Sequence, residues 1–308
     1  MRVGYACICL GQEELRCQRS TILKNATPER LRALIHANLD GLEQILELNE
    51  QRGLRLFRLG NDFIPFASHP VNELRWWDDY GYRFRSIGKR VRAWGHRISF
   101  HASHYTILNS ANPAVVASAL ADVHYMGRVL EAMELGPEHK IILHGGISTP
   151  TFPEAEARLE AALAEVAPEH RRHLVLENDE RFYSARRMID LSARVGLPVV
   201  VDTLHHACHP DGWDDLSPAA LLRRVFATWT AEDGPPKIHF SSQDPEKKRG
   251  AHHYWIEEAE LESFLAETRG VATDFDIMFE AKGKDLAVMA VLPVLEADPR
   301  FRVEVRAA

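Results

Sequence analysis

A single (β/α)8 barrel, the TIM-barrel form of the α/β class, is the fold that this sequence predicts. Short apolar runs alternate with longer helical patterns eight times along the chain. The 308 residues suit one such barrel, which typically needs roughly 250 residues. An open, doubly wound sheet would usually carry a glycine-rich phosphate turn, and neither a G-x-G-x-x-G nor a Walker sequence is present. We therefore expect one domain over residues 1–308.

The eight expected strands are short and nearly continuous in apolar residues. This pattern is typical of a parallel sheet that is covered by helices. The strands are expected at residues 2–7, 54–58, 98–101, 140–143, 173–176, 198–201, 236–239 and 274–279.

The helical segments carry their own start and stop signals. The first begins at Thr27-Pro28, an N-cap followed by a proline at the first helical position, and ends at Gly53. Apolar residues spaced three and four apart between Leu31 and Leu46 mark its buried face. Further helices are expected at residues 75–95, 153–166, 184–195, 256–268 and 285–296, and after the capping pairs Asn112-Pro113 and Ser217-Pro218.

The composition is that of an ordinary globular protein, with an unusual number of histidines. The net charge of −7 argues against nucleic-acid binding over the whole surface but not over one face. No apolar run is long enough for a membrane span and no signal peptide is readable, so a cytoplasmic protein is expected. The four cysteines lack a metal-type spacing and are expected as reduced thiols. Many of the 16 histidines fall beside strand ends.

Side chains that bind metals end six consecutive expected strands. They are His101, His144, Glu177, Asp202 with His205 three residues on, His239 with His252 in the following loop, and Glu280. In a parallel barrel these strand ends open into one mouth, where converging carboxylates repel unless cations lie between them. Imidazole and carboxylate together suit Zn²⁺, Mn²⁺ or Fe²⁺. One ion takes about four to six ligands, so two or three divalent ions are expected.

Clusters of this kind serve phosphoester cleavage, because the ions activate water and hold both the attacked and the leaving oxygens. Lys237 lies two residues before His239 and shares its strand face. Its ammonium could lie near a phosphate. Alternatively, it could be a lysine with a depressed pKa or a modified lysine that acts as a ligand.

With these residues assembled, the chain resembles the UV damage endonuclease family of DNA repair nucleases. The matching segments spread from residue 4 to residue 284, and single pieces such as His144-Gly145-Gly146 are weak. The ordered set is specific, above all LENDER at 176–181, VDTLHH at 201–206 and EAKGK at 280–284. The chain departs from the family at His104, where Gln is usual, and at Cys9, where Asn is common.

The resemblance implies a barrel similar to endonuclease IV and a manganese-type cluster, with Zn²⁺ or Mg²⁺ as alternatives. The ligands it implies are the eight side chains named above, with Glu177 also a catalytic candidate. His69 and Lys237 would lie close to the scissile phosphate. The implied substrate is duplex DNA with cyclobutane pyrimidine dimers or 6-4 photoproducts. It would be cut immediately 5′ to the lesion to leave 3′-hydroxyl and 5′-phosphate ends, with no obligate protein partner.

Recognition of such a lesion requires the DNA to bend or a base to leave the stack, which costs less where damaged bases stack poorly. His104 and Tyr105 are candidates to wedge into the vacated space, Tyr5 to stack on the extruded lesion, and Arg58 to contact the DNA. Two basic stretches, at residues 83–97 and 247–249, are candidates for phosphate contacts.

Three other functions remain open. An abasic-site endonuclease of the endonuclease IV type, or a sugar isomerase like xylose isomerase, would keep the barrel and the metals. An isomerase would be expected to lack the basic stretches and the wedge loop. A non-catalytic damage-binding protein would not need so complete a ligand set.

Overall fold

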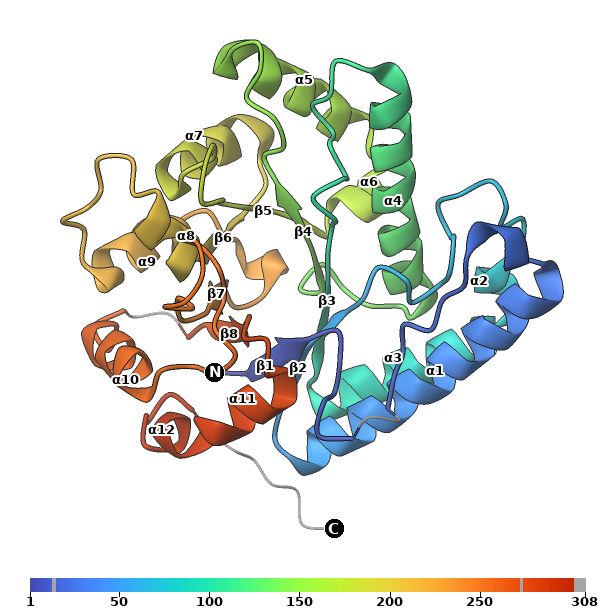
Figure 1. Ribbon diagram of the computed structural model, residues 1–308, viewed down its shortest axis with the longest axis horizontal. Helices are drawn as coiled ribbons and strands as arrows, with labels where there is room; N and C mark the ends of the chain where they lie inside the picture. Colours follow the sequence, from blue (N-terminus) through green and yellow to red (C-terminus); the bar gives the residue numbers. More distant parts are fainter. Residues whose placement is uncertain (13–14, 272–273, 302–308) are drawn as a thin grey trace.

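The computed structural model describes residues 1–12, 15–271 and 274–301, and it confirms the predicted barrel (Figure 1). Eight parallel strands close in sequence order from β1 to β8. Their bounds are β1 Val3–Ala6, β2 Leu56–Leu59, β3 Arg97–His101, β4 Lys140–His144, β5 Leu174–Glu177, β6 Val199–Asp202, β7 Lys237–Phe240 and β8 Asp276–Phe279. Each strand begins and ends within two residues of its expected bounds.

Helices surround this barrel and cover its outer face (Figure 1). The longer ones are α1 Pro28–Gln51, α3 Gly81–Trp94, α4 Pro113–Ala132, α5 Phe152–Glu165, α7 Ala185–Val195, α9 Pro218–Phe226, α10 Glu258–Glu267 and α11 Lys284–Ala290. The predicted caps of three of them are present, because Thr27, Asn112 and Ser217 each accept a backbone N–H from the first turn.

Two expected helices are each divided in two. The segment 75–95 forms α2 Trp76–Asp79 and α3, with the break at Tyr80, whose φ of −110° is not helical. The segment 285–296 forms α11 and α12 Leu292–Glu296, where Pro293 lacks the N–H that a continuous helix needs. Short elements that the sequence did not predict are α6 Pro168–Arg171, α8 Thr203–Cys208 and the 3-10 turns Leu23–Asn25 and Ala231–Asp233.

The barrel interior is layered because alternate residues of each strand point inward. The lowest layer is charged and contains Arg97, Lys140 and Asp276, all buried. Apolar side chains form the middle, with Ala6, Leu56 and Met278 in one cluster and Ile142, Val175 and Val200 in another. The next inward residues of the strands are the histidines and acids of the mouth.

An ion-pair network closes the lowest layer. The Asp276 carboxylate lies 3.0 Å from Arg2 Nε and 2.9 Å from an Arg97 terminal nitrogen. Lys140 Nζ lies 2.5 Å from Asp233 Oδ1. A buried charge is strongly unfavourable unless it has a partner of opposite charge. These ion pairs therefore allow charged side chains to fill the lower end of the barrel, which we call the floor.

The structure also bears on two expectations from composition. All four cysteines are free thiols, as predicted. No helix among the described residues has the length and apolar character needed to cross a membrane.

Candidate metal centre and nucleic-acid interface

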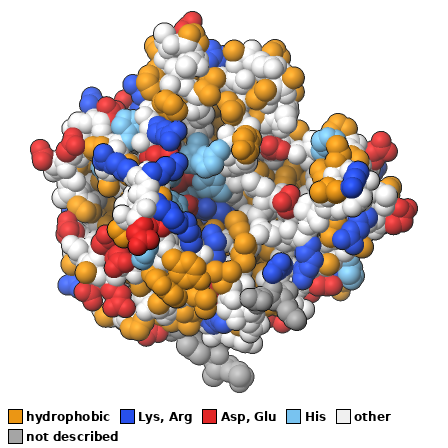
Figure 2. Space-filling model, viewed as in Figure 1, with side chains coloured by type: hydrophobic (Ala, Val, Ile, Leu, Met, Phe, Trp, Pro, Cys, Tyr) orange, Lys and Arg blue, Asp and Glu red, His pale blue; other side chains and the backbone are white. Residues whose placement is uncertain are grey.

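A hollow of about 410 Å³ opens at the mouth of the barrel, where the C-terminal ends of the strands meet. Figure 2 shows histidine side chains near the middle of this face, with Lys and Arg side chains beside them. Predicted metal ligands that line the hollow are His101, His144, His205, His252 and Glu280. Arg58, Lys282 and Lys284 line it as well.

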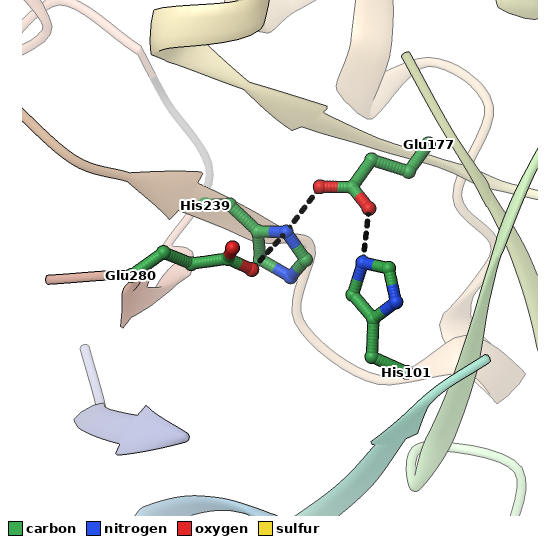
Figure 3. A group of neighbouring side chains, drawn as sticks. All are labelled: His101, Glu177, His239 and Glu280. Atoms are coloured by element: carbon green, nitrogen blue, oxygen red, sulfur yellow. Dashed lines mark hydrogen bonds and ion pairs between the residues drawn. The ribbon is translucent and has the colours of Figure 1, made fainter. Parts of the chain in front are cut away.

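The first group of possible ligands is centred on the buried carboxylate of Glu177. Its Oε2 lies 2.7 Å from His101 Nε2, and its other oxygen contacts His239 Nδ1 (Figure 3). His239 Nδ1 lies 3.0 Å from Glu280 Oε1. In this group of four residues, one donor atom from each lies within 4.8 Å of the others. His144 adjoins the group, with Nε2 3.6 Å from Glu177 Oε2.

The second group joins Asp202, His205 and His252, whose donor atoms also lie within 4.8 Å of one another. Asp202 ends β6 and caps α8, because its Oδ1 accepts the backbone N–H of His205 at 2.8 Å. This short helix turns His205 back over the mouth, where its ring centre lies 5.8 Å from that of His252. The sequence order D-T-L-H therefore produces a compact pair of donors, as predicted.

Backbone carbonyls fix the orientation of three of these histidines. The Nδ1–H of His101 donates to the Ala102 carbonyl at 2.9 Å, that of His205 to Asn178 at 3.1 Å and that of His252 to Glu280 at 2.7 Å. A carbonyl oxygen only accepts, so Nδ1 holds the proton in each ring. Nε2 is then the nitrogen of each ring that can bind a metal ion, once it carries no proton of its own.

The site has strong internal electrostatics. Burial alone would raise the pKa of Glu177, but the adjacent imidazoles of His239 and His101 outweigh it and hold this pKa well below its usual range. Burial lowers the pKa of His144 to about 3, so this ring is neutral near pH 7. Burial also opposes the charged form of His205, yet the carboxylates of Asp202 and Glu177 raise its pKa to about 9.

The residues present fit a bound cation. The buried atoms Asp202 Oδ2 and His144 Nδ1 have no hydrogen-bond partner in the described chain. A buried polar atom without a partner is unfavourable by roughly 1–3 kcal/mol. Burial raises the pKa of Asp202, and the carboxylates of Glu280 and Glu177 contribute to this rise. A cation beside Asp202 would give Oδ2 a partner and offset the repulsion among these carboxylates. The mixed nitrogen and oxygen donors suit Mn²⁺, Zn²⁺ or Fe²⁺.

The loop after β3 reaches the edge of this hollow. The ring of His104 stacks on that of His144, with centres 5.1 Å apart and planes 19° apart. The neighbouring Tyr105 leaves 88% of its surface exposed. The sequence predicted both residues at this loop, and the stacking of His104 joins the loop directly to the possible ligands.

Comparison with known proteins places the chain in a family. A model of the UV-endonuclease UvdE family matches residues 1–302. The chain belongs to this family. The UV DNA damage endonuclease of Clostridium perfringens (strain 13 / Type A) is 30% identical over 297 residues, which cover 96% of this chain and 71% of that relative. The UV DNA damage endonuclease of Bacillus cereus (strain B4264) is 28% identical over 276 residues, which cover 89% and 86%.

Solved structures agree with the family assignment. The crystal structure of SacUVDE superposes with a TM-score of 0.90 at 30% identity, covering 98% of this chain and all of that one. Endonuclease IV from Thermus thermophilus superposes with a TM-score of 0.58 at 17% identity, covering 96% of this chain and 98% of that one. This second likeness shows the shared barrel fold alone.

Three predicted contacts of this UvdE-family chain need correction, at Tyr5, Arg58 and Lys237. Tyr5 is fully buried, and its hydroxyl donates to Asn49 Oδ1 at 2.9 Å, so its ring cannot stack on an extruded base. Arg58 is only 5% exposed and is paired with Glu280 and His239, so it supports the site from within rather than contacting DNA.

Lys237 lies on the inward face that was predicted, but it is buried below the mouth and 1% exposed. It therefore cannot contact a phosphate that rests on the rim. Burial and the positive charges of Arg97 and Arg58 hold its pKa well below that of an ordinary lysine. The carboxylates of Glu177 and Asp276 oppose this fall in pKa but do not outweigh it.

His69 lies outside the hollow that the possible ligands line. It is exposed beside a smaller hollow of about 210 Å³ together with Phe66 and Ser103. Its Nδ1 accepts the backbone N–H of Val71 at 3.0 Å. The two hollows meet at the β3 loop, through Ser103 and His104, so the place of His69 near the scissile phosphate stays a prediction.

The basic stretch at residues 83–97 is only partly neutralised by ion pairs, and Arg85 and Lys89 remain exposed on α3. Arg83 pairs with Asp40 and Glu43, and Arg90 with Glu47, across the interface between α3 and α1. The stretch at 247–249 does lie near the mouth, since Lys248 lines a hollow of about 390 Å³ beside His104 and His144.

Asn178 is a supporting residue that the sequence reasoning missed. Its side-chain Oδ1 accepts the Asp202 N–H at 2.8 Å, and its Nδ2 donates to the Asp202 carbonyl at 3.1 Å. Its own carbonyl orients His205. Its position directly after Glu177 at a strand end was the signal that could have identified it.

Proposed function

We propose that this UvdE-family protein nicks duplex DNA immediately 5′ to ultraviolet photoproducts and leaves 3′-hydroxyl and 5′-phosphate ends. Both cyclobutane pyrimidine dimers and 6-4 photoproducts are proposed substrates. The observation that carries the proposal is the meeting of eight possible ligands, from six strands and their loops, at one open mouth. The similar UV DNA damage endonucleases come from bacteria, whose chromosome lies in the cytoplasm, and we propose that this protein acts there as well.

We further propose that the mouth holds two or three divalent ions, with Mn²⁺ as the expected metal and Zn²⁺ or Mg²⁺ as alternatives. The ligands would be the two groups described above together with His144. Ions in such a cage supply Lewis-acid activation of the phosphodiester and of the attacking water.

The chain's own residues have separate roles in this proposal. Lys282 and Lys284 at the rim attract the phosphate backbone and place the scissile bond over the mouth. Arg58 holds Glu280 and His239 in position. His104 and Tyr105 enter the gap that a poorly stacked lesion leaves. Lys237 lies buried below the ligands, where its position would support the site rather than bind DNA.

A defined substrate tests the proposal. An oligonucleotide duplex with one thymine dimer is incubated with chelator-treated protein, with and without added Mn²⁺. A metal-dependent cut directly 5′ to the dimer is expected, with no cut in the undamaged duplex. A protein that remains fully active after removal of all metal, or cuts only an abasic-site duplex included in parallel, would contradict it.

The wedge role has its own test. Tyr105→Ala is expected to weaken binding to the damaged duplex about tenfold and to affect undamaged DNA much less, because stacking energy is lost only where the bases open. Tyr82→Ala is the matched control, since Tyr82 is 80% exposed but lies on α3. Equal weakening on both duplexes would reject the wedge role.

A further inference from the structure

The exposed aromatic side chains are concentrated at the mouth of the barrel. Among the described residues, five large aromatic side chains are exposed, namely Tyr82, Tyr105, Phe182, Tyr254 and Trp255. All except Tyr82 lie on loops that follow strands β3, β5 and β7 at their C-terminal ends. Exposed aromatic surface is unfavourable in water, and the presence of four of these five side chains at one rim indicates a surface that binds a ligand.

Tyr254 and Trp255 form a pair on the loop between β7 and α10. Their rings pack edge to face with centres 4.9 Å apart, and they remain 42% and 44% exposed. They follow His252 and its neighbour His253 directly in the chain. The pair is therefore attached to the backbone that presents one of the possible metal ligands.

Backbone hydrogen bonds hold this loop in place. The Gly283 N–H donates to the Tyr254 carbonyl at 2.8 Å, and the Lys282 N–H donates to the His253 carbonyl at 3.0 Å. The His253 N–H donates to the Ser242 carbonyl at 2.8 Å. These hydrogen bonds connect the segment that carries the pair to the loops after both β7 and β8. Both rings are therefore held at the surface in the described conformation.

The position of the pair is set by the barrel. In a closed ring of eight strands β3 and β7 are four strands apart, so their loops face each other across the mouth. The loop after β3 carries Tyr105, and the loop after β7 carries Trp255. The possible metal ligands lie between them. Lys282 and Lys284 line the hollow beside β7, since both follow the neighbouring strand β8. Lys282 lies in the loop, 3.4 Å from Asp244 Oδ2, and Lys284 begins α11.

We propose that Trp255, backed by Tyr254, is a stacking surface for a nucleotide on the 5′ side of the cut. This inference rests on the proposed function. If the lesion lies against Tyr105 and the bond cut 5′ to it lies over the ligands, the DNA beyond that bond continues to the opposite rim. Aromatic rings bind bases of any sequence by stacking, and the two lysines provide the complementary charge for the phosphates.

The test compares a long dimer-containing duplex with one shortened on the 5′ side of the dimer, so that no nucleotide reaches the opposite rim. Trp255→Leu keeps apolar bulk but removes the aromatic face, and Trp255→Phe restores a ring. On the long duplex Trp255→Leu is expected to raise KM about tenfold with little change in kcat, because it removes a binding contact away from the reacting bond. Trp255→Phe is expected to recover most of the loss.

On the shortened duplex the ratio of variant to wild-type KM should fall close to one. An unchanged KM on the long duplex would overturn the inference. So would an equal loss on both duplexes, since that outcome would mean that Trp255 acts only by holding His252. Failure of the wild-type protein to cut either duplex would instead contradict the proposed function itself. Tyr82→Ala serves as the control for loss of an exposed ring.

Discussion

Glu177 shows how one side chain connects the possible ligands of the barrel. Its carboxylate is fully buried at the end of β5 and contacts imidazoles from β3 and β7. A single buried acid with two such partners organises the whole first group. The two imidazoles balance the negative charge of Glu177 in the described structure. Bound cations would balance it in the metal-loaded protein.

We predict that Glu177→Gln reduces nicking of dimer-containing DNA by more than about a hundredfold, because an amide is a poor ligand for a hard cation. The same exchange at Glu262, on the exposed side of α10, is the control and should leave nicking unchanged. Thermal unfolding with added Mn²⁺ gives a second readout. The metal should raise the melting temperature of wild type and of Glu262→Gln more than that of Glu177→Gln, and an equal rise would contradict the ligand role.

Single residues also mark where sequence reasoning was limited. The ligand-type residues were predictable because an ionisable side chain at the end of a buried strand is costly to bury without a partner. The face that each strand residue occupies was harder to predict, because a barrel strand is buried on both sides and shows no alternation. Tyr5 therefore could not be separated from its inward neighbours Gly4 and Ala6, and it packs on Phe57 outside the barrel.

At the scale of elements, helix α3 and the loop after β7 show how charge depends on packing. Both contain several cations in the sequence, but Arg83 and Arg90 of α3 pair with acids of α1. The pairing could not be read locally, because the partners are about forty residues apart in the chain. Lys248 in the loop after β7 lies instead at the mouth.

This contrast predicts different salt dependence for two matched variants. Lys248→Gln is expected to weaken DNA binding and to reduce the slope of log affinity against log salt by about one. Arg90→Gln is expected to leave that slope unchanged and to alter stability by less than about 1 kcal/mol, because its ion pair is at the surface. Binding titrations at several salt concentrations measure both. A larger effect at Arg90 would restore α3 as the interface.

The helix boundaries were predicted only in part. The caps at Thr27, Asn112 and Ser217 were predictable because each satisfies backbone N–H groups within its own turn. The break between α2 and α3 falls at Tyr80, directly before Gly81, a local signal that the sequence reasoning did not use. There the hydroxyl of Tyr80 donates to the Arg32 carbonyl at 3.0 Å, a contact with a distant helix.

At the scale of the whole molecule, the barrel separates a structural floor from a reactive mouth. The floor holds Asp276 between Arg2 and Arg97, and the mouth holds the possible ligands. Burial alone would raise the pKa of Asp276, but these two arginines lower it below its usual value. A carboxyl whose pKa is lowered on folding stabilises the native state when ionised, and this contribution is lost as the pH falls through the folded-state pKa.

Asp276→Asn is accordingly predicted to lower the free energy of unfolding near neutral pH by roughly 3–5 kcal/mol, because it leaves buried arginines without their partner. The difference from wild type should stay constant down to about pH 5 and narrow below about pH 4, as the wild-type carboxyl takes up its proton. Denaturant titrations over this range provide the measurement. A difference that grows on acidification would contradict the assignment.

The overall fold was predictable because eight strand–helix units and six polar strand ends fit one architecture. The sequence did not predict how deep each inward side chain lies within the barrel. Lys237 and His239 share a face, yet only one lies at the mouth, and this distinction depends on the stagger of neighbouring strands rather than on local pattern.

The central claim is that side chains spread over about two hundred residues hold cations together at one mouth. Crystals of the protein loaded with Mn²⁺, measured at the manganese absorption edge, test it most directly. The account predicts two or three anomalous peaks among Glu177, His239, Glu280 and the Asp202 group. Peaks only at other places on the surface, or none at saturating Mn²⁺, would contradict it.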